Sequence, residues 1–120
     1  MARPLVVKVT CGADDPERVS QALTVAATAV ASGVDVSLWL TGDAAWLGVT
    51  GRVPDLALTH SVPLVDLVDA VLSGGRVTVC TQCAARRGIT EDQLAPGARI
   101  AGAATFLDEC LADDAQALVY

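Results

Sequence analysis

The chain has 120 residues, of which 52% are hydrophobic and 18% charged, and its 14 acidic and 8 basic side chains give a formal net charge of −6. Disordered chains are poorer in apolar residues and richer in charge, so this composition indicates a folded protein, and the length fits a single domain spanning 1–120. A net negative chain lacks the basic face that phosphate backbones require, which argues against nucleic acid as a partner.

The first third of the chain predicts two strands with a helix between them. Residues 5–10 form a β-branched apolar run typical of a buried strand. Asp15 is a favourable N-cap, and the proline after it fits the first position of a helix that extends to about Ser32. Apolar and polar side chains alternate over 34–40, which predicts a second strand with one partly polar face, near a sheet edge or a subunit contact.

The remainder predicts three more strands, further helices and one long connection. Residues 48–61 form that connection, where the lone His60 is expected to be a solvated loop residue. The strands are expected at 76–79, 98–101 and 117–120. The helices are expected at 44–47, 63–74, 81–87 and 103–112. Cys110 falls on the apolar stripe of the last helix, which predicts that it is buried together with Phe106, Leu107 and Leu111.

Strands alternate with helices from one end of the chain to the other. This order predicts an α/β fold with three layers, in which a parallel sheet of about five strands is covered on both faces by helices through right-handed crossovers. Gly74 and Gly75 precede a strand, whereas a phosphate-binding loop follows a strand and opens a helix. We therefore expect no bound cofactor.

Three side chains with useful chemistry follow predicted strands, where open parallel sheets form their sites. They are Cys11, Asp43 and Cys80, and the last begins the motif Cys80-Thr81-Gln82-Cys83. A cysteine between a strand end and a helix start is close to unpaired backbone N–H groups, which favour the nucleophilic thiolate. Arg86 adds positive charge nearby, as does the arginine after it, and Cys83 is close enough to resolve a disulfide or share a ligand.

Each of these residues also has a structural interpretation. Cys80 and Cys83 can pack as small hydrophobic residues, although for Cys80 we favour a reactive thiol. If the first and third strands are neighbours, Cys11 faces Cys80 as a resolving thiol or third ligand, but a core position at a turn is favoured. Asp43 is expected to cap the helix that starts at Ala44 rather than to bind a substrate. A closed zinc site needs four ligands, so we expect no metal.

The cysteine segment, residues 77–89, resembles that of the DsrE/DsrF-like family, whose members include TusD-like sulfur-relay subunits. In that family a strand ends in a cysteine, followed by a short alanine-containing helix and an Arg-Gly pair with an aliphatic residue, which here are Arg87-Gly88-Ile89. The segments 14–18, 33–36, 42–43 and 97–102 and the terminal strand also fit. At Cys83 the chain differs from TusD-like sequences, which tend to have a small aliphatic residue there, and this leaves redox or metal chemistry open.

The resemblance implies a small α/β/α subunit that assembles into trimers or hexamers and carries sulfur as a persulfide on Cys80. We expect a sulfur carrier or sulfurtransferase-relay subunit that meets sulfur donor and acceptor proteins. The alternatives are a thiol–disulfide switch formed by Cys80 and Cys83, or a non-catalytic oligomeric binding subunit. Trp39 and Trp46 are expected at a subunit interface.

The expected compartment is the cytoplasm, where thiols stay reduced. No apolar run approaches the ~20 residues that a membrane span requires. The apolar segment 5–7 is interrupted by Lys8 and soon followed by Asp14 and Asp15, which differs from a secretory signal. In a reducing compartment, four cysteines are more suited to reactive chemistry or metal binding than to a disulfide framework.

Overall fold

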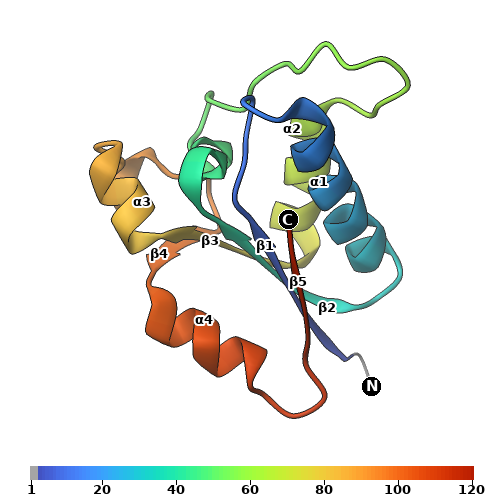
Figure 1. The fold of residues 1–120 in the computed structure, drawn as a ribbon, viewed down its shortest axis with the longest axis vertical. Coiled ribbons are helices and arrows are strands. Elements are labelled where there is room, and N and C mark those ends of the chain that lie inside the picture. Colours follow the sequence, from blue (N-terminus) through green and yellow to red (C-terminus); the bar gives the residue numbers. More distant parts are fainter. Residues whose placement is uncertain (1–2) are drawn as a thin grey trace.

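The computed structural model describes residues 3–120 and contains a parallel sheet with helices on both faces. The strands are β1 (Pro4–Val9), β2 (Asp35–Leu40), β3 (Arg76–Cys80), β4 (Ala98–Ala101) and β5 (Gln116–Val119). The helices are α1 (Pro16–Ala31), α2 (Leu64–Gly74), α3 (Thr81–Arg86) and α4 (Ala103–Cys110), with 3-10 turns η1 (Gly42–Gly48) and η2 (Glu91–Gln93). The strand order is β4-β3-β2-β1-β5, with α1 and α2 on one side and α4 on the other (Figure 1). The predicted three-layer α/β fold with five parallel strands is confirmed.

The helix α1 begins where the sequence predicts. The Asp15 side chain accepts a hydrogen bond from the backbone N–H of Arg18 at 3.4 Å, and Pro16 occupies the first helical position, where its missing N–H costs nothing. The helix ends at Ala31, and Gly33 then turns the chain with a φ of +82°. The predicted end at about Ser32 is therefore correct to within one residue.

The main core lies between the sheet and the pair of helices α1 and α2. Every second residue of the three central strands points into it, as the period of a strand requires. The strands contribute Val7, Val9, Val36, Leu38, Leu40, Val77 and Val79, and the helices contribute Val19, Ala22, Leu23, Ala26, Leu64, Leu67, Val68 and Val71. Each buried Val or Leu side chain stabilises the fold by about 1.5–3 kcal/mol relative to leaving it in water.

The other face of the sheet is covered by α4, which buries none of its own residues completely. Leu107 and Leu111 are 55% and 74% exposed, and Cys110 is only half-buried. The prediction that these three residues form a buried face with Phe106 was therefore wrong. The helix has only eight residues and contacts the sheet through Phe106, whose ring meets that of Trp39 edge-to-face at 5.3 Å, and through Glu109.

The strand β2 lies at the centre of the sheet, between β1 and β3, so the prediction that placed it near an edge or a subunit contact was wrong. Ser37 and Trp39 form its polar face, and both donate hydrogen bonds to Glu109 beneath α4. Because the half-buried carboxylate of Glu109 accepts hydrogen bonds from both side chains, these two donors need no water as a partner. Trp39 is 1% exposed, so it does not reach a subunit interface.

The strands β1, β2 and β3 end at the same edge of the sheet, and the chain passes closely over itself there. Gly42 has a φ of +54°, and a Cβ atom at this position would lie 2.6 Å from the carbonyl oxygen of Thr10. Only glycine fits both conditions. In residues 3–120, no helix combines the length and apolar character needed to cross a bilayer.

Candidate functional site

Cys80 is both the last residue of β3 and the N-cap of α3, so the strand passes into the helix without a connecting loop (Figure 1). The residue pairs with Ala101 of β4 in the sheet register, which fixes its backbone. Its side chain is half-buried and its thiol is free. The sulfur is therefore held on a rigid element at the carboxyl edge of the sheet while solvent still reaches the residue.

The pKa of the Cys80 thiol lies below its ordinary value. Partial burial raises this pKa, but hydrogen bonds from the backbone N–H groups of Cys83 and Gln82 and from the Cys83 side chain lower it, and the positive charge of Lys8 lowers it further. The lowering effects outweigh burial. A larger fraction of Cys80 is therefore thiolate at neutral pH than for an ordinary cysteine, and the thiolate is the nucleophile.

Cys83 lies in the first turn of α3 and is buried. Its Sγ accepts a hydrogen bond from the backbone N–H of Gly42 at 3.1 Å, which connects α3 to the start of η1. Its side chain is also one of the groups that lower the pKa of the Cys80 thiol, so the two cysteine side chains lie near one another. The structure therefore brings together the two cysteines that the motif predicts as a pair.

The basic residues around this pair differ in their relation to the sulfurs. Arg86 is exposed at the far end of α3, and the guanidinium of Arg87 donates to the backbone carbonyl of Cys83 at 3.2 Å. The cation that acts on Cys80 is Lys8 of β1, whose ammonium group lies 5.1 Å from the centre of the Phe106 ring. Sequence reasoning missed Lys8, although a lysine that interrupts an apolar strand is a usable signal.

Cys11 does not join the pair. The strand β2 lies between β1 and β3, so the condition under which Cys11 faces Cys80 is not met. Cys11 is buried, and its pKa is raised by that burial and by the negative charges of Asp15 and Asp14. This environment suits a core thiol rather than a nucleophile.

Asp43 lies in the first turn of η1 and is half-buried. The N-cap of η1 is Thr41, so the prediction that Asp43 caps a helix starting at Ala44 was wrong. Its backbone packs instead against Gly12, where a Cβ atom would lie 2.8 Å from the Asp43 carbonyl oxygen. Asp43 thus belongs to the contact between the turns that follow β1 and β2.

Residues 5–116 match the DsrE/DsrF-like family. The chain belongs to this family. An uncharacterised protein, MK0008, from Methanopyrus kandleri is 32% identical over 85 residues, which cover 71% of this chain and 68% of that protein.

Solved structures confirm the DsrE-like fold. The crystal structure of the ychN protein from E. coli matches with a TM-score of 0.80 and 21% identity, covering 100% of both chains. MTH1491, a protein of unknown function from Methanobacterium thermoautotrophicum, matches with a TM-score of 0.73 and 12% identity, again over 100% of both chains. At these identities the likeness concerns the fold, and the chemistry has to be argued from this chain's own residues.

A polar network that the sequence did not predict lies between α4 and the sheet of this DsrE-like protein. Glu109 of α4 accepts hydrogen bonds from Ser37 Oγ at 2.5 Å and Trp39 Nε1 at 3.0 Å, both on one carboxylate oxygen, and from Arg99 Nη2 at 2.6 Å on the other. The Nε of Arg99 donates to Thr78 Oγ1 at 2.8 Å. Partial burial raises the pKa of Glu109, but these hydrogen bonds and the Arg99 charge lower it below its ordinary value. The network therefore fixes α4 on the sheet face that also carries Lys8.

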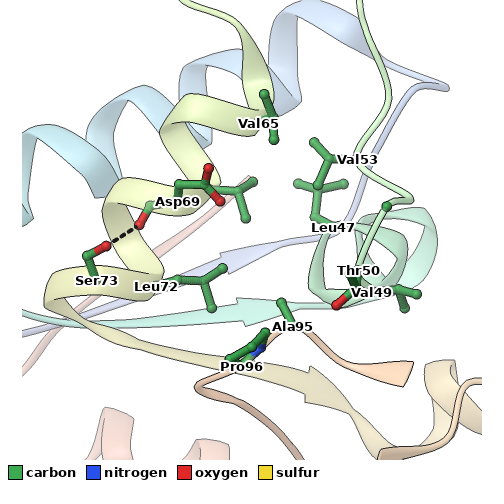
Figure 2. A pocket seen from close by; sticks show the side chains of 12 residues that line it. Leu47, Val49, Thr50, Val53, Val65, Asp69, Leu72, Ser73, Ala95 and Pro96 are labelled. Carbon is green, nitrogen blue, oxygen red and sulfur yellow. Dashed lines mark hydrogen bonds between the residues drawn. The ribbon is translucent and has the colours of Figure 1, made fainter. Parts of the chain in front are cut away.

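An apolar cavity of about 510 Å³ lies between α2 and the chain that follows η1 (Figure 2). Figure 2 shows aliphatic side chains converging on it from both sides, among them Leu47, Val53 and Leu72. Ser73 donates a hydrogen bond to the backbone carbonyl of Asp69 at 2.8 Å and offers no free donor to the cavity. Cys80 is not among the residues that line it.

The remaining candidate ligands and the fourth cysteine lie apart from the cysteine pair. Among residues 3–120, no three His, Cys, Asp or Glu side chains are grouped as metal ligands. Cys110 lies on α4, and its pKa is raised by partial burial and by the charge of Glu109.

Proposed function

We propose that this DsrE-like protein carries sulfane sulfur as a persulfide on Cys80. The observation that carries the proposal is the placement of an accessible thiol at the junction of β3 and α3, where backbone N–H groups of Gln82 and Cys83 hydrogen-bond to the sulfur. These donors stabilise negative charge on the sulfur both as a thiolate and as a departing group. Membership of the DsrE/DsrF-like family suggests sulfur relay and agrees with this chemistry.

The transfer follows thiol–persulfide exchange. The Cys80 thiolate attacks the outer sulfur of a donor persulfide, R–S–SH. The donor's S–S bond breaks, R–S⁻ leaves with the bonding electron pair, and Cys80 becomes Cys80–S–SH. An acceptor thiolate then attacks the outer sulfur of this persulfide, takes the sulfur with its proton, and returns Cys80 to the thiolate.

The persulfide on Cys80 can also react within the protein, with Cys83. If the Cys83 thiolate attacks the inner sulfur of Cys80–S–SH, a disulfide forms between the two cysteines and hydrosulfide, HS⁻, leaves. The proximity of the two sulfurs favours this step and with it a second candidate function, a thiol–disulfide switch in which a persulfide is the oxidant. Both functions need reduced cysteines at the start, and we propose the cytoplasm as the compartment.

The test is to treat the reduced protein with a low-molecular-weight persulfide and to weigh its tryptic peptides. We expect the mass of one added sulfur atom on the peptide that contains Cys80, and none in Cys80→Ser. Cys110→Ser is the matched control, because it removes another half-buried free thiol and should leave the adduct unchanged. An adduct that survives Cys80→Ser would overturn the proposal, as would a native protein that shows neither an adduct nor a disulfide between Cys80 and Cys83.

We also propose that the protein assembles with copies of itself into trimers or hexamers. Large apolar side chains remain exposed on α4 and on the edge strand β5, namely Leu107, Leu111 and Val119. Water contact with such residues is unfavourable, and a second copy that covered them would remove it. Sulfur donor and acceptor proteins are the further partners that the proposed relay requires.

A further inference from the structure

A second cavity, of about 520 Å³, lies beyond the C-terminal end of α3 and holds two arginine side chains. Its walls come from three separate parts of the chain: Trp46 of η1, Thr50 and Arg52 after it, and the segment from Arg87 to Gln93. The volume falls within the range of about 300–1,000 Å³ that is usual for small-molecule sites. Cys80 does not line it, so the cavity is separate from the sulfur site.

The two guanidinium groups of this cavity have no acidic partner. The ion pairs among residues 3–120 involve Arg18, Arg76 and Arg99, and neither Arg52 nor Arg87 takes part in one. Arg87 donates one N–H to the carbonyl of Cys83 at 3.2 Å, and the guanidinium carbon of Arg52 lies 4.0 Å from the centre of the Trp46 ring. Each guanidinium is therefore held by one contact, and its other N–H groups remain available to hydrogen-bond to a ligand.

The balance of charge in the lining is positive, although the chain as a whole carries a net charge of −6. Asp92 is the one acidic residue of the lining, and its carboxylate already accepts a hydrogen bond from the hydroxyl of Thr90. Two guanidiniums with free donors present the planar fork that fits carboxylate and phosphate oxygens. Trp46 adds a flat apolar wall beside them.

We propose that this cavity binds small organic anions of the carboxylate or phosphate class, with Arg52 and Arg87 holding the anionic group and Trp46 packing against the rest of the ligand. The site lies at the C-terminal end of α3, whereas Cys80 is the N-cap of that helix, and neither Cys80 nor Cys83 lines the cavity. The proposal therefore stands apart from sulfur transfer, and Cys80→Ser should bind the anion as the native protein does.

Titration calorimetry with pyrophosphate and with citrate, at an ionic strength kept constant with sodium chloride, measures the binding and separates the phosphate class from the carboxylate class. Intrinsic fluorescence locates the site, because Trp39 is enclosed in the protein and Trp46 lines the cavity. We expect saturable binding of at least one probe and a change in emission that Trp46→Phe removes. Absence of saturable binding of both probes would overturn the proposal.

Matched arginine variants test which groups hold the anion. Arg87→Gln and Arg52→Gln should each weaken binding about tenfold, the effect of losing one charge-assisted hydrogen bond. Arg86→Gln removes the neighbouring exposed charge and should leave the affinity within about twofold. Arg52→Gln decides the matter if Arg87→Gln disturbs α3, because Arg52 lies in the connection after η1. Equal losses in Arg86→Gln and Arg52→Gln would show that only the general charge matters, and the proposed site would be wrong.

Discussion

The Sγ of Cys83 accepts a hydrogen bond from the backbone N–H of Gly42 across 3.1 Å, which joins the helix of the cysteine motif to the turn after the central strand. Replacing Cys83 by Ala leaves this N–H without its partner, and we expect a loss of about 1 kcal/mol in unfolding free energy. Cys83→Ser keeps an acceptor and a donor at the position and should lose less. Urea unfolding of the two variants measures the difference, and equal losses would assign the effect to packing alone.

Alkylation of Cys80 by iodoacetamide should reach its half-maximal rate at a pH below about 8.5, the value of an unperturbed cysteine. The rate follows the thiolate fraction, and the hydrogen bonds from Gln82 and Cys83 lower the pKa of Cys80. The pH–rate profile of a variant that keeps Cys80 as the reactive thiol provides the measurement. A midpoint at or above the ordinary cysteine value would contradict the inferred activation.

Lys8→Gln tests the charge that acts on Cys80 from β1. Loss of a cation disfavours the thiolate, so the pKa of Cys80 should rise and alkylation at neutral pH should become slower. Arg86→Gln serves as the control, because that arginine is exposed at the far end of α3. A larger effect from Arg86→Gln than from Lys8→Gln would show that the arginine, and not the strand lysine, activates the thiol.

Glu109→Gln should destabilise the protein at pH 7 by about 1–3 kcal/mol, because charge-assisted hydrogen bonds from Ser37, Trp39 and Arg99 are lost or weakened. The pKa of Glu109 is lower in the folded protein, so its stabilisation is present above the unfolded pKa of about 4.3 and is lost as the pH falls through the folded value.

Unfolding free energy measured against pH checks this prediction. The native protein should lose stability on acidification below about pH 4.3, and Glu109→Gln should lack that part of the decline. Asp108→Asn is the control at the adjacent exposed position and should change stability by no more than about 0.5 kcal/mol. If Glu109→Gln and the native protein had identical profiles of stability against pH, the Glu109 carboxylate would not be the source of this pH dependence.

Leu111→Asp should lower the oligomeric mass of the protein if copies associate through α4. Leu111 follows α4 as its C-cap residue, and its side chain is 74% exposed. If a second copy covered this position, the aspartate charge would lose its water, which is unfavourable. Val62→Asp is the control, since Val62 is a 56% exposed residue outside α4. Light scattering that finds a monomer in the native protein, or the same mass for Leu111→Asp as for Val62→Asp, would argue against this surface.

The strand-to-helix junction could be predicted from the sequence because its signals are local. The apolar run that ends at Cys80 predicts a buried strand, and the motif through Cys83 predicts a short helix directly after it. The structure has both elements. The cap at Asp15 is equally local, and it too was predicted correctly. Periodicity and capping need only a few neighbouring residues, so one chain suffices to find them.

Features that depend on distant residues could not be predicted in the same way. The polar face of β2 indicated an exposed strand, because nothing near Trp39 in the sequence shows that Glu109 accepts its hydrogen bond. The stripe of Leu107, Cys110 and Leu111 indicated a buried helix face, although most of that surface is uncovered in this chain. The effect of Lys8 on the pKa of Cys80 could not be predicted locally either, because it depends on the strand order, in which only β2 separates β1 from β3.

The crossing of α4 from β4 at one edge of the sheet to β5 at the other has a consequence for local unfolding (Figure 1). The strands β1 to β4 are sequential neighbours, whereas β5 pairs with β1 only after the chain has returned across the whole sheet. The carboxylate of Glu109 lies midway along this return path, so its loss should free α4 and β5 together as one cooperative unit. Hydrogen exchange in Glu109→Gln should then accelerate in residues 103–119 while the amides of β2 and β3 stay protected. Residues 103–119 would thus open and close independently of β3, the strand that presents Cys80.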